Sequence, residues 1–321
     1  MRRIVSYLIM GIATICSYAE EPAGTAELIK YGDFNSWVTR QIHESKIIGG
    51  EQKTVYAIGP TRTIEGSDPY HNLGGSPWGS SNVLAKVAGV TKTSNAVYPD
   101  DHPGHGKCAK LTTEFEHCKV MGLVNMEVMV AGSIFLGEMV EPIKSTKNPY
   151  SKMIMGIPFT RRPKALQFDY KLEMPQNAER VYSSGFGKKK TYPGHDESEA
   201  LIILQRRWED ADGNVYAKRV GTGRMRFSKS TDWVENYQVP VMYGDITKSP
   251  NFKEEMDLIP KDRSYYTRNS HGKLVPVIET GWDDADATPT HLFVMFSAGS
   301  GEAYVGTPGL TFWVDDVALV Y

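Results

Sequence analysis

Two adjacent carboxylates, Asp315 and Asp316, lie in the closing segment GLTFWVDDVALVY (309–321), which otherwise has the composition of a buried β-strand. Side chains on a strand alternate between its two faces, and here both faces are otherwise apolar. Whichever face meets the core, one carboxylate should point inward, where it needs hydrogen-bond donors, a cationic side chain or a metal ion. The sequence leaves open which of the two is buried.

A second polar cluster, DDHPGHG (100–106), places His102 and His105 at a spacing that could serve a transition metal, with His117 a short way on. Its proline and two glycines indicate a flexible turn, and no fourth ligand is evident. We therefore interpret this segment as a solvated loop. We interpret EDADGN (209–214) as a hairpin turn, because it lacks the remaining ligands of a calcium-binding loop.

Acidic side chains could also hydrolyse a glycosidic bond. That reaction needs two carboxyl groups about 5–5.5 Å apart for retention, or about 6.5–9.5 Å apart for inversion. Since this separation depends on the fold, a catalytic role and a solvent-facing position are both open for four glutamates that could project from a sheet: Glu114, Glu116, Glu199 and Glu235.

Sugar recognition has a different signature, because pyranose C–H faces stack on tryptophan and tyrosine rings while acidic and amide groups bind the hydroxyls. Three aromatic residues in expected loops are flanked by such groups, in SPWGSSN, AVYPDD and WDDADATP. We predict a carbohydrate-binding site formed by Trp78, Tyr98, Trp282, Asp283 and Asp284.

The elements that must position these residues are β-strands. Strict alternation in LQFDYKLEM (166–174) predicts a half-buried antiparallel strand, and residues 200–208 and 215–227 predict a hairpin around an Asp-Gly turn. HLFVMFSA (291–298) is apolar nearly throughout, as in a central strand. Further strands are predicted at 54–60, 107–115, 133–139, 233–243 and in the closing segment.

Helical periodicity is scarce, and only 28–45 and 251–259 offer a plausible helical turn or two. The expected architecture is all-β, with two antiparallel sheets packed as a sandwich in a single domain, residues 20–321. The polar stretches 176–199 and 244–290 are predicted to be long loops, which are usually functional or mobile.

The composition limits the class of partner. The 321 residues carry a formal net charge of −2 with lysine and arginine spread along the chain, which argues against nucleic acid as a partner.

Residues 1–19 have the basic start, apolar run and small-residue cleavage site of a secretory signal peptide. This predicts an exported protein, with lipid attachment at Cys16 as the less favoured alternative. No other run approaches the roughly 18 apolar residues needed to span a membrane.

Cys108 and Cys118 form an even pair in a chain predicted to be exported. A disulfide would require a sharp turn to bring their Cα atoms within about 4.4–6.8 Å, because much of the intervening segment reads as one strand. A bridge and two free thiols therefore remain open.

Several segments, in order, resemble the bacterial putative carbohydrate-metabolism domain (PCMD) family, with the likeness strongest over residues 70–321. The segments are SPWGSSN, GKCAKL, PFTRRPKALQFDYKL, the DW…VPVMY strand, PTHLFVMFSAGSGEAYVGTPG and GLTFWVDDVALVY. The resemblance implies a jelly-roll sandwich similar to carbohydrate-binding modules, in exported proteins of glycan-foraging bacteria. It supplies no catalytic residues.

In similar jelly rolls, a carboxylate on the last strand and an oxygen ligand from the first strand hold a structural calcium ion. The resemblance thus suggests Asp33 and Asp315 as calcium ligands, against the alternative that one aspartate binds backbone amides or an arginine. No cofactor is required by this interpretation. We expect a glycan-binding, non-catalytic protein; the alternatives are a glycoside hydrolase or lyase using a carboxylate pair, and a structural or adhesive surface module.

Overall fold

The computed structural model of the protein describes residues 24–71, 75–87, 89–120, 124–176, 179–185, 187–300 and 302–321. The signal peptide and Cys16 predicted from the sequence lie outside these ranges. Within them the chain is all-β, as expected, because strands are joined by loops and by single turns of 3-10 helix. None of the helices described is long and apolar enough to cross a membrane. The turns are η1 (Lys46–Ile48), η2 (Pro149–Lys152), η3 (Glu254–Met256) and η4 (Lys261–Arg263).

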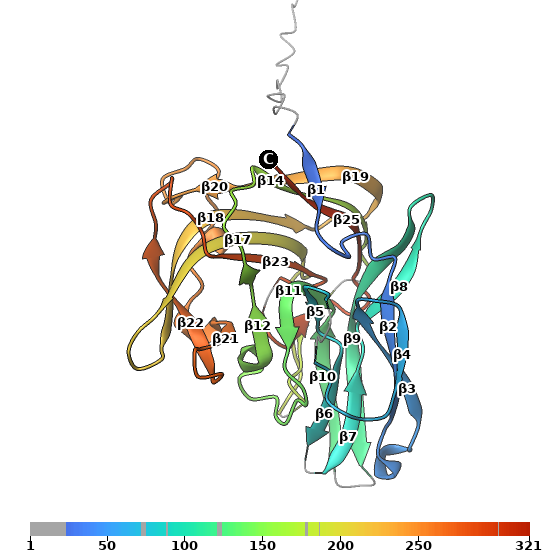
Figure 1. The fold of residues 1–321 in the computed structure, drawn as a ribbon. Helices are drawn as coiled ribbons and strands as arrows, with labels where there is room; N and C mark the ends of the chain where they lie inside the picture. Colours follow the sequence, from blue (N-terminus) through green and yellow to red (C-terminus); the bar gives the residue numbers. More distant parts are fainter. Residues whose placement is uncertain are drawn as a thin grey trace, which may run out of the picture.

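A seven-stranded antiparallel sheet includes the closing segment of the chain as one of its central strands (Figure 1). Its strands are β10 (Val124–Ala131), β9 (Gly106–Val120), β25 (Thr311–Val320), β14 (Ala165–Glu173) and β19 (Thr231–Pro240), with β1 (Ala26–Leu28) paired to β25 and β8 (Val97–His102) paired to β9. The strands predicted at 107–115, 166–174, 233–243 and 309–321 are thereby confirmed.

A ten-stranded sheet contains the predicted hairpin and the predicted central strand. In order, its strands are β13 (Ile157–Pro158), β23 (His291–Ser297), β17 (Ser198–Glu209), β18 (Val215–Phe227), β22 (Leu274–Trp282), β21 (Tyr266–Arg268), β12 (Met153–Met155), β11 (Ser133–Met139) and β5 (Trp78–Ser80), with β20 (Met242–Tyr243) paired to β18. Because β11 pairs with β23 as well as with β12, the row of strands from β23 to β11 closes into a ring.

The prediction of two purely antiparallel sheets is wrong in two respects. First, β18 pairs with β22, and β12 with β21, in parallel. Parallel neighbours need a long crossover, and the residues between β18 and β22 supply it. Residues 244–290 are therefore only partly loop, since β21 and β22 lie within them, and 176–199 likewise contains β15 (Arg180–Tyr182) and β16 (Lys190–Tyr192).

Second, three smaller sheets accompany the two large ones: β16-β15-β24, β3-β2-β4 and β6-β7. The remaining bounds are β2 (Trp37–His43), β3 (Gln52–Ile58), β4 (Arg62–Glu65), β6 (Val83–Val87), β7 (Val90–Ser94) and β24 (Val305–Gly306). The helical turn considered at 28–45 is wrong, because this segment runs from the end of β1 through a turn into β2. On β2, Val38, Arg40 and Ile42 are all buried, which is the two-residue period of a strand.

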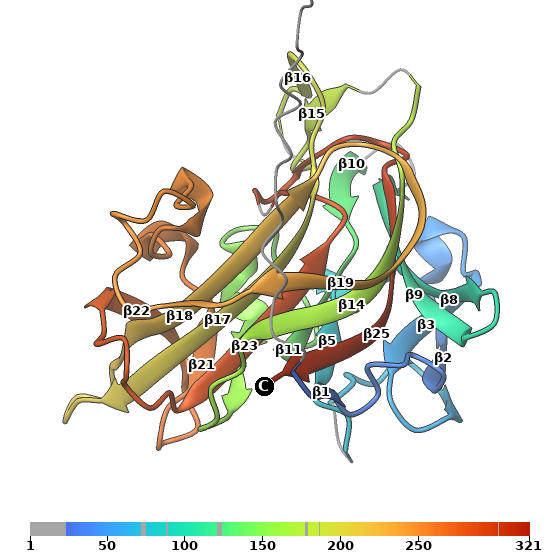
Figure 2. The ribbon, with the colours of Figure 1, turned by 90° about the horizontal axis from the view of Figure 1, so that it is seen from above.

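The two large sheets pack against each other and share the main core (Figure 2), with Phe168 of β14 in edge-to-face contact with Phe296 of β23 at 4.8 Å between ring centroids. Strand β17 is buried on both faces. Ala200, Ile202 and Leu204 face this core, and Leu201 and Ile203 face a second cluster inside the ring. This double burial explains why the segment is apolar without alternation.

Cys108 and Cys118 are both free thiols, which answers the alternative left open by the sequence. Cys108 and Cys118 lie on one strand, β9, so their ten-residue separation extends over about 33 Å at about 3.3 Å per residue. Burial raises the pKa of the Cys108 thiol to about 12.

Candidate functional site

A cleft with a volume of about 560 Å³ opens on the inner side of the strand ring. Its walls come from β17, β18 and the segment that contains η3 and η4. Its lining includes four arginines and four carboxylates, together with two tyrosines and apolar side chains. The charged and aromatic residues are Arg219, Arg224, Arg226, Arg263, Glu199, Glu254, Glu255, Asp257, Tyr150 and Tyr265.

Alternation on β17 and β18 explains how charged groups reach this interior. On β17, Glu199 precedes Leu201 and Ile203 on the same face, so its side chain enters the ring although it is wholly buried. On β18, Arg224 and Arg226 are two residues apart and point to that face. Arg224 donates to Glu199 Oε2 through Nε at 3.0 Å and Nη2 at 2.6 Å.

The other oxygen of Glu199 has no such partner. Its Oε1 atom is buried and accepts no hydrogen bond from the described residues, and the same is true of the Arg226 Nε donor, which lies 3.5 Å from Oε2 as an ion pair only. A buried polar atom without a partner is costly unless a ligand or ordered water satisfies it. One unused acceptor and one unused donor thus lie buried at the wall of the cleft.

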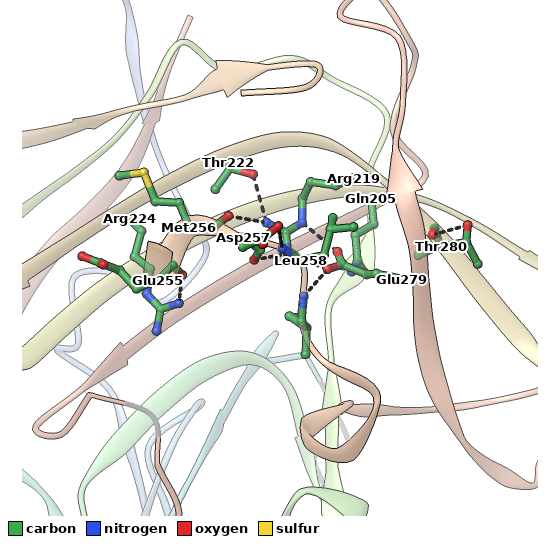
Figure 3. Close-up of polar contacts among 12 residues, drawn as sticks. Gln205, Arg219, Thr222, Arg224, Glu255, Met256, Asp257, Leu258, Glu279 and Thr280 are labelled. Atoms are coloured by element: carbon green, nitrogen blue, oxygen red, sulfur yellow. Dashed lines mark hydrogen bonds and ion pairs between the residues drawn. The ribbon is translucent and has the colours of Figure 1, made fainter. Parts of the chain in front are cut away.

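A buried ion pair fixes the floor of the cleft. Arg219 binds Glu279 through Nε at 2.7 Å and Nη2 at 2.5 Å, and Gln205 donates to the same carboxylate at 2.7 Å (Figure 3). Burial alone would raise the pKa of Glu279, but the charge and hydrogen bonds of Arg219, with those of Gln205 and the Ile259 amide, hold it below its usual value. Glu279 is therefore ionised at neutral pH.

The same arginines hold the outer wall in place. Figure 3 shows the guanidinium groups of Arg219 and Arg224 pointing at backbone carbonyls of the segment around η3, namely those of Glu255, Met256 and Asp257. The amide of Ile259 donates to Glu279 at 2.7 Å. This segment, expected to be a loop with a helical turn at 251–259, thus becomes a defined wall because buried charges bind its backbone.

Two tyrosines extend the cleft. Tyr150 and Tyr265 pack edge to face at 5.7 Å and line both this cavity and a neighbouring one of about 180 Å³. The second cavity is lined mainly by apolar side chains, including Met153 and Met295. Burial raises the pKa of both tyrosines, so their hydroxyls stay protonated at neutral pH. The arrangement offers paired donors and acceptors next to aromatic and apolar surface.

The sequence matches the family described as "Putative carbohydrate metabolism domain" (PCMD) over residues 63–320. The chain belongs to the PCMD family. No curated protein matches it. It is similar to two solved structures, a putative glycoside hydrolase from Bacteroides thetaiotaomicron (TM-score 0.46, 17% identity, 88% of this chain and 70% of that chain covered) and one from Bacteroides vulgatus (TM-score 0.42, 14% identity, 92% and 95% covered).

The aromatic residues singled out in this PCMD chain lie apart from one another. Trp78 on β5 is only 2% exposed and donates its indole N–H to the Lys30 carbonyl at 3.0 Å. Tyr98 on β8 is half-buried, with its hydroxyl 3.0 Å from Glu114. Trp282, at the end of β22, is connected to the cleft, because the guanidinium of Arg219 lies over its ring at 5.5 Å.

The acidic residues next to Trp282 have separate surroundings. Asp283 is buried and accepts two hydrogen bonds from Arg206, at 2.5 and 2.9 Å, whereas Asp284 is exposed. The hydrogen bonds of Arg206, outweighing burial, lower the pKa of Asp283.

The two aspartates of the closing strand differ in burial and in partner. Asp315 is the buried one, with His102 Nδ1 at 2.8 Å, and Asp316 is partly exposed, with His105 Nδ1 at 2.8 Å. Burial raises the pKa of Asp315 to about 8. The partner suggested for it, Asp33, contacts Asn35 instead, and the two aspartates share no group of ligand atoms among the described residues.

Sequence reasoning considered Glu199 and Tyr265 but missed the arginines of the cleft and Tyr150. The signal available was on β18, where Arg224 and Arg226 alternate with Met225, as in a strand with one charged face. Strand β17, next to β18 in the sheet, is buried on both faces. The charged face of β18 therefore cannot face open water, and it should line an enclosed cavity.

Proposed function

We propose that this protein binds an oligosaccharide in the cleft inside the strand ring and does so without cleaving it. The observation that carries the proposal is the unpartnered, buried Oε1 atom of Glu199 at the cleft wall, next to the free donor of Arg226. A sugar hydroxyl both donates and accepts, so one hydroxyl can satisfy the carboxylate while a neighbouring hydroxyl accepts from the guanidinium.

The charge balance of the cleft supports a neutral, polyhydroxylated ligand over an anion. The lining contains four arginines and four carboxylates, and Glu279 at the floor pairs with Arg219, so the cleft offers hydrogen bonds of both kinds and no large excess of one charge. Charged groups make the stronger hydrogen bonds, of about 1.5–3 kcal/mol each. Sugars are bound in this way when their hydroxyls lie between guanidinium and carboxylate groups.

The shape supports a ligand of more than one sugar unit. The volume of about 560 Å³ lies within the range of roughly 300–1,000 Å³ typical of small-ligand sites, and the adjoining cavity adds about 180 Å³. Tyr150 and Tyr265 stand where the two cavities meet, so a chain of sugars crossing from one to the other would pass their rings.

Membership of the PCMD family, whose description refers to carbohydrate metabolism, is in keeping with this ligand class. The proposal includes export from the cytoplasm and a jelly-roll relationship to carbohydrate-binding modules. It also retains Trp282 as a contributor through its contact with Arg219. The cleft does not include Trp78, Tyr98, Asp283 or Asp284 in its lining, so the proposal assigns them no contact with the sugar there.

A glycan-array screen of the purified protein, followed by calorimetric titration of the best oligosaccharide, tests the proposal. Glu199→Gln keeps the side-chain shape and removes the charge, and Arg263→Ala shortens an exposed side chain at the cleft rim. We expect each to weaken binding about 10-fold or more, which corresponds to about 1.4 kcal/mol. Glu65→Gln and Arg268→Ala are matched controls on exposed strand positions outside the cleft.

Thermal melting of each variant separates lost binding from lost folding. The proposal is wrong if folded wild-type protein binds no glycan, or if both cleft variants bind as tightly as the wild type. If the oligosaccharide releases new reducing ends during incubation with the protein, the protein is a glycoside hydrolase, which is the alternative considered from the sequence, and the proposal of binding without cleavage is wrong.

A further inference from the structure

The two histidines of DDHPGHG and the two aspartates of the closing strand form one cluster on the seven-stranded sheet. His102 ends β8 and His105 lies in the turn to β9, while Asp315 and Asp316 lie on β25. Glu235 of β19 completes the group. None of these residues lines the cleft described above, so the cluster is a separate feature.

Each histidine is oriented by a carboxylate. The Nδ1 atoms of His102 and His105 lie 2.8 Å from Asp315 and Asp316, respectively. An imidazole that donates its Nδ1 hydrogen to a carboxylate carries its lone pair on Nε2, and the same arrangement orients histidine ligands in metal sites. With the Nδ1 hydrogen donated in this way, each ring would present its Nε2 lone pair to a metal ion.

The backbone of β25 is irregular at the place where this happens. In a regular strand, adjacent residues point to opposite faces, yet both aspartates bind histidines of one short turn. Asp316 has a φ of 47°, in the left-handed region, and the register with β14 shifts between Gln167 and Asp169. The irregularity brings the two carboxylates to the same loop.

Packing then fixes the two rings. They stack on each other at 4.1 Å with an angle of 10°, and His102 stacks on Trp233 at 3.6 Å on β19. The next-but-one residue on β19 is Glu235, whose Oε1 lies 3.9 Å from His105 Nε2. Ligand atoms of His102, His105 and Glu235 all lie within 4.8 Å of one another.

The charge around this group is not balanced within the chain. Four carboxylates meet here, of which Asp169 and Asp315 are buried, at 3% and 0% exposure. Among the described residues, no lysine or arginine forms an ion pair with Asp169, Glu235, Asp315 or Asp316. Buried carboxylates without a cationic partner are stabilised by a bound cation.

From this geometry we propose that His102, His105 and Glu235 bind a divalent transition-metal ion of the zinc class, with Asp315 and Asp316 orienting the two histidines. Two imidazole nitrogens and one carboxylate oxygen are the ligands such ions prefer, and a water molecule would be the fourth. Bonds of about 2.0–2.2 Å require ligand atoms about 3.3 Å apart, so the ligands must close in by up to 1.5 Å or so. Glu235, whose side chain is 59% exposed, is free to do this.

A second set of ligand atoms, from His105, Asp169 and Asp316, also lies within 4.8 Å. It would engage His105 through Nδ1, which is 3.8 Å from Asp169 but already bound to Asp316. The first set leaves that hydrogen bond intact, which is why we assign the metal to it.

Titration of the full protein with Zn²⁺ alone, in competition with a chromogenic chelator at neutral pH, tests the site. We expect one ion per chain, and at least 10-fold weaker binding in both His105→Ala and Glu235→Gln. These positions are chosen because both are partly exposed, whereas His102 is buried and its loss could unfold the protein. His117→Ala is the matched control, since this exposed histidine also lies near a carboxylate, 3.7 Å from Glu127.

Substitution with Co²⁺ gives an independent readout, because a four-coordinate site gives intense visible absorption that Glu235→Gln should abolish. The inference is overturned if folded wild-type protein binds no stoichiometric Zn²⁺. It is also overturned if His105→Ala and Glu235→Gln bind Zn²⁺ like the wild type, or if Ca²⁺ raises the melting temperature and Zn²⁺ does not.

Discussion

The cleft and the histidine cluster contrast in how their charges are balanced. In the cleft, four arginines face four carboxylates, and the buried pair of Arg219 and Glu279 anchors the wall. In the cluster, four carboxylates meet two histidines, and no lysine or arginine among the described residues pairs with them. A site in which arginines and carboxylates balance suits a neutral ligand rich in hydroxyls. A site with an excess of carboxylates suits a cation.

The two regions also differ in what positions their side chains. In the cleft, regular alternation on β17 and β18 suffices to turn Glu199, Arg224 and Arg226 inward. In the cluster, the strand must depart from regularity at Asp316. Substitutions that affect only the cleft or only the histidine cluster are therefore the best tests of this contrast.

The largest effect on stability should come from the anchor of the cleft. Glu279→Gln leaves Arg219, itself 1% exposed, buried without a counter-charge. Breaking a buried pair by removing one partner costs about 3–5 kcal/mol, so we expect the free energy of unfolding to fall by about 3 kcal/mol in urea denaturation at pH 7. Glu173→Gln, which breaks the exposed pair with Lys171, should change it by less than about 1 kcal/mol. Equal effects of the two substitutions would contradict a role for the buried pair as anchor.

The contribution of Glu279 should depend on pH with a definite sign. Its pKa is lower in the folded state than its usual value of 4.5, so the stability it contributes is complete above about pH 4.5 and is lost as the pH falls through the lower, folded-state pKa. The difference in unfolding free energy between wild type and Glu279→Gln should thus shrink with acidification below pH 4.5. A difference that stays constant from pH 7 to pH 3 would disprove this linkage.

An intermediate effect is expected at the cluster alone. Asp315→Asn keeps the volume of the side chain but replaces one of the carboxyl oxygens that orient His102, and loss of such a supporting carboxyl group typically weakens metal binding 10- to 100-fold. Zinc titration should show this loss, while the affinity for the oligosaccharide stays that of the wild type. A parallel loss of glycan binding would mean that the two regions are coupled.

The smallest effect is expected from the aromatic wall. Tyr265→Leu removes the ring where the two cavities meet, and contacts of this kind contribute about 0.5–1.5 kcal/mol. We expect calorimetry to show roughly 3- to 10-fold weaker glycan binding with zinc binding unchanged. Tyr192→Leu, at an exposed tyrosine of β16, is the control. Unchanged glycan affinity in Tyr265→Leu would remove this ring from the site.

The sequence predicted a strand correctly where apolar residues alternate with polar ones, as in β14, and where an apolar run is nearly continuous, as in β17 and β23. The segment at 28–45 misled because its apolar spacing fits a helical turn as well as a strand, and pairing with β3 and β4 decides for the strand. That pairing is tertiary information, which overrides local periodicity.

The site residues were individually visible but could not be grouped. His102 and Asp315 were each considered for a metal, yet they are 213 residues apart and meet only because β8 and β25 both pair with β9. The helical turn expected at 251–259 is present as η3, but its place in the wall of the cleft could not be predicted, since it is held there through backbone carbonyls. Conversely, the uncertainty over Cys108 and Cys118 vanishes once both are placed on one strand.

The most direct test of the account is a crystal structure of the protein soaked with the oligosaccharide selected by the glycan array. We expect density for the sugar inside the strand ring, with a hydroxyl within hydrogen-bond distance of Glu199 Oε1 and the chain passing Tyr150 and Tyr265. Density confined to the surface around Trp282 and Asp284, with the cleft holding only water, would contradict the assignment of glycan binding to the cleft.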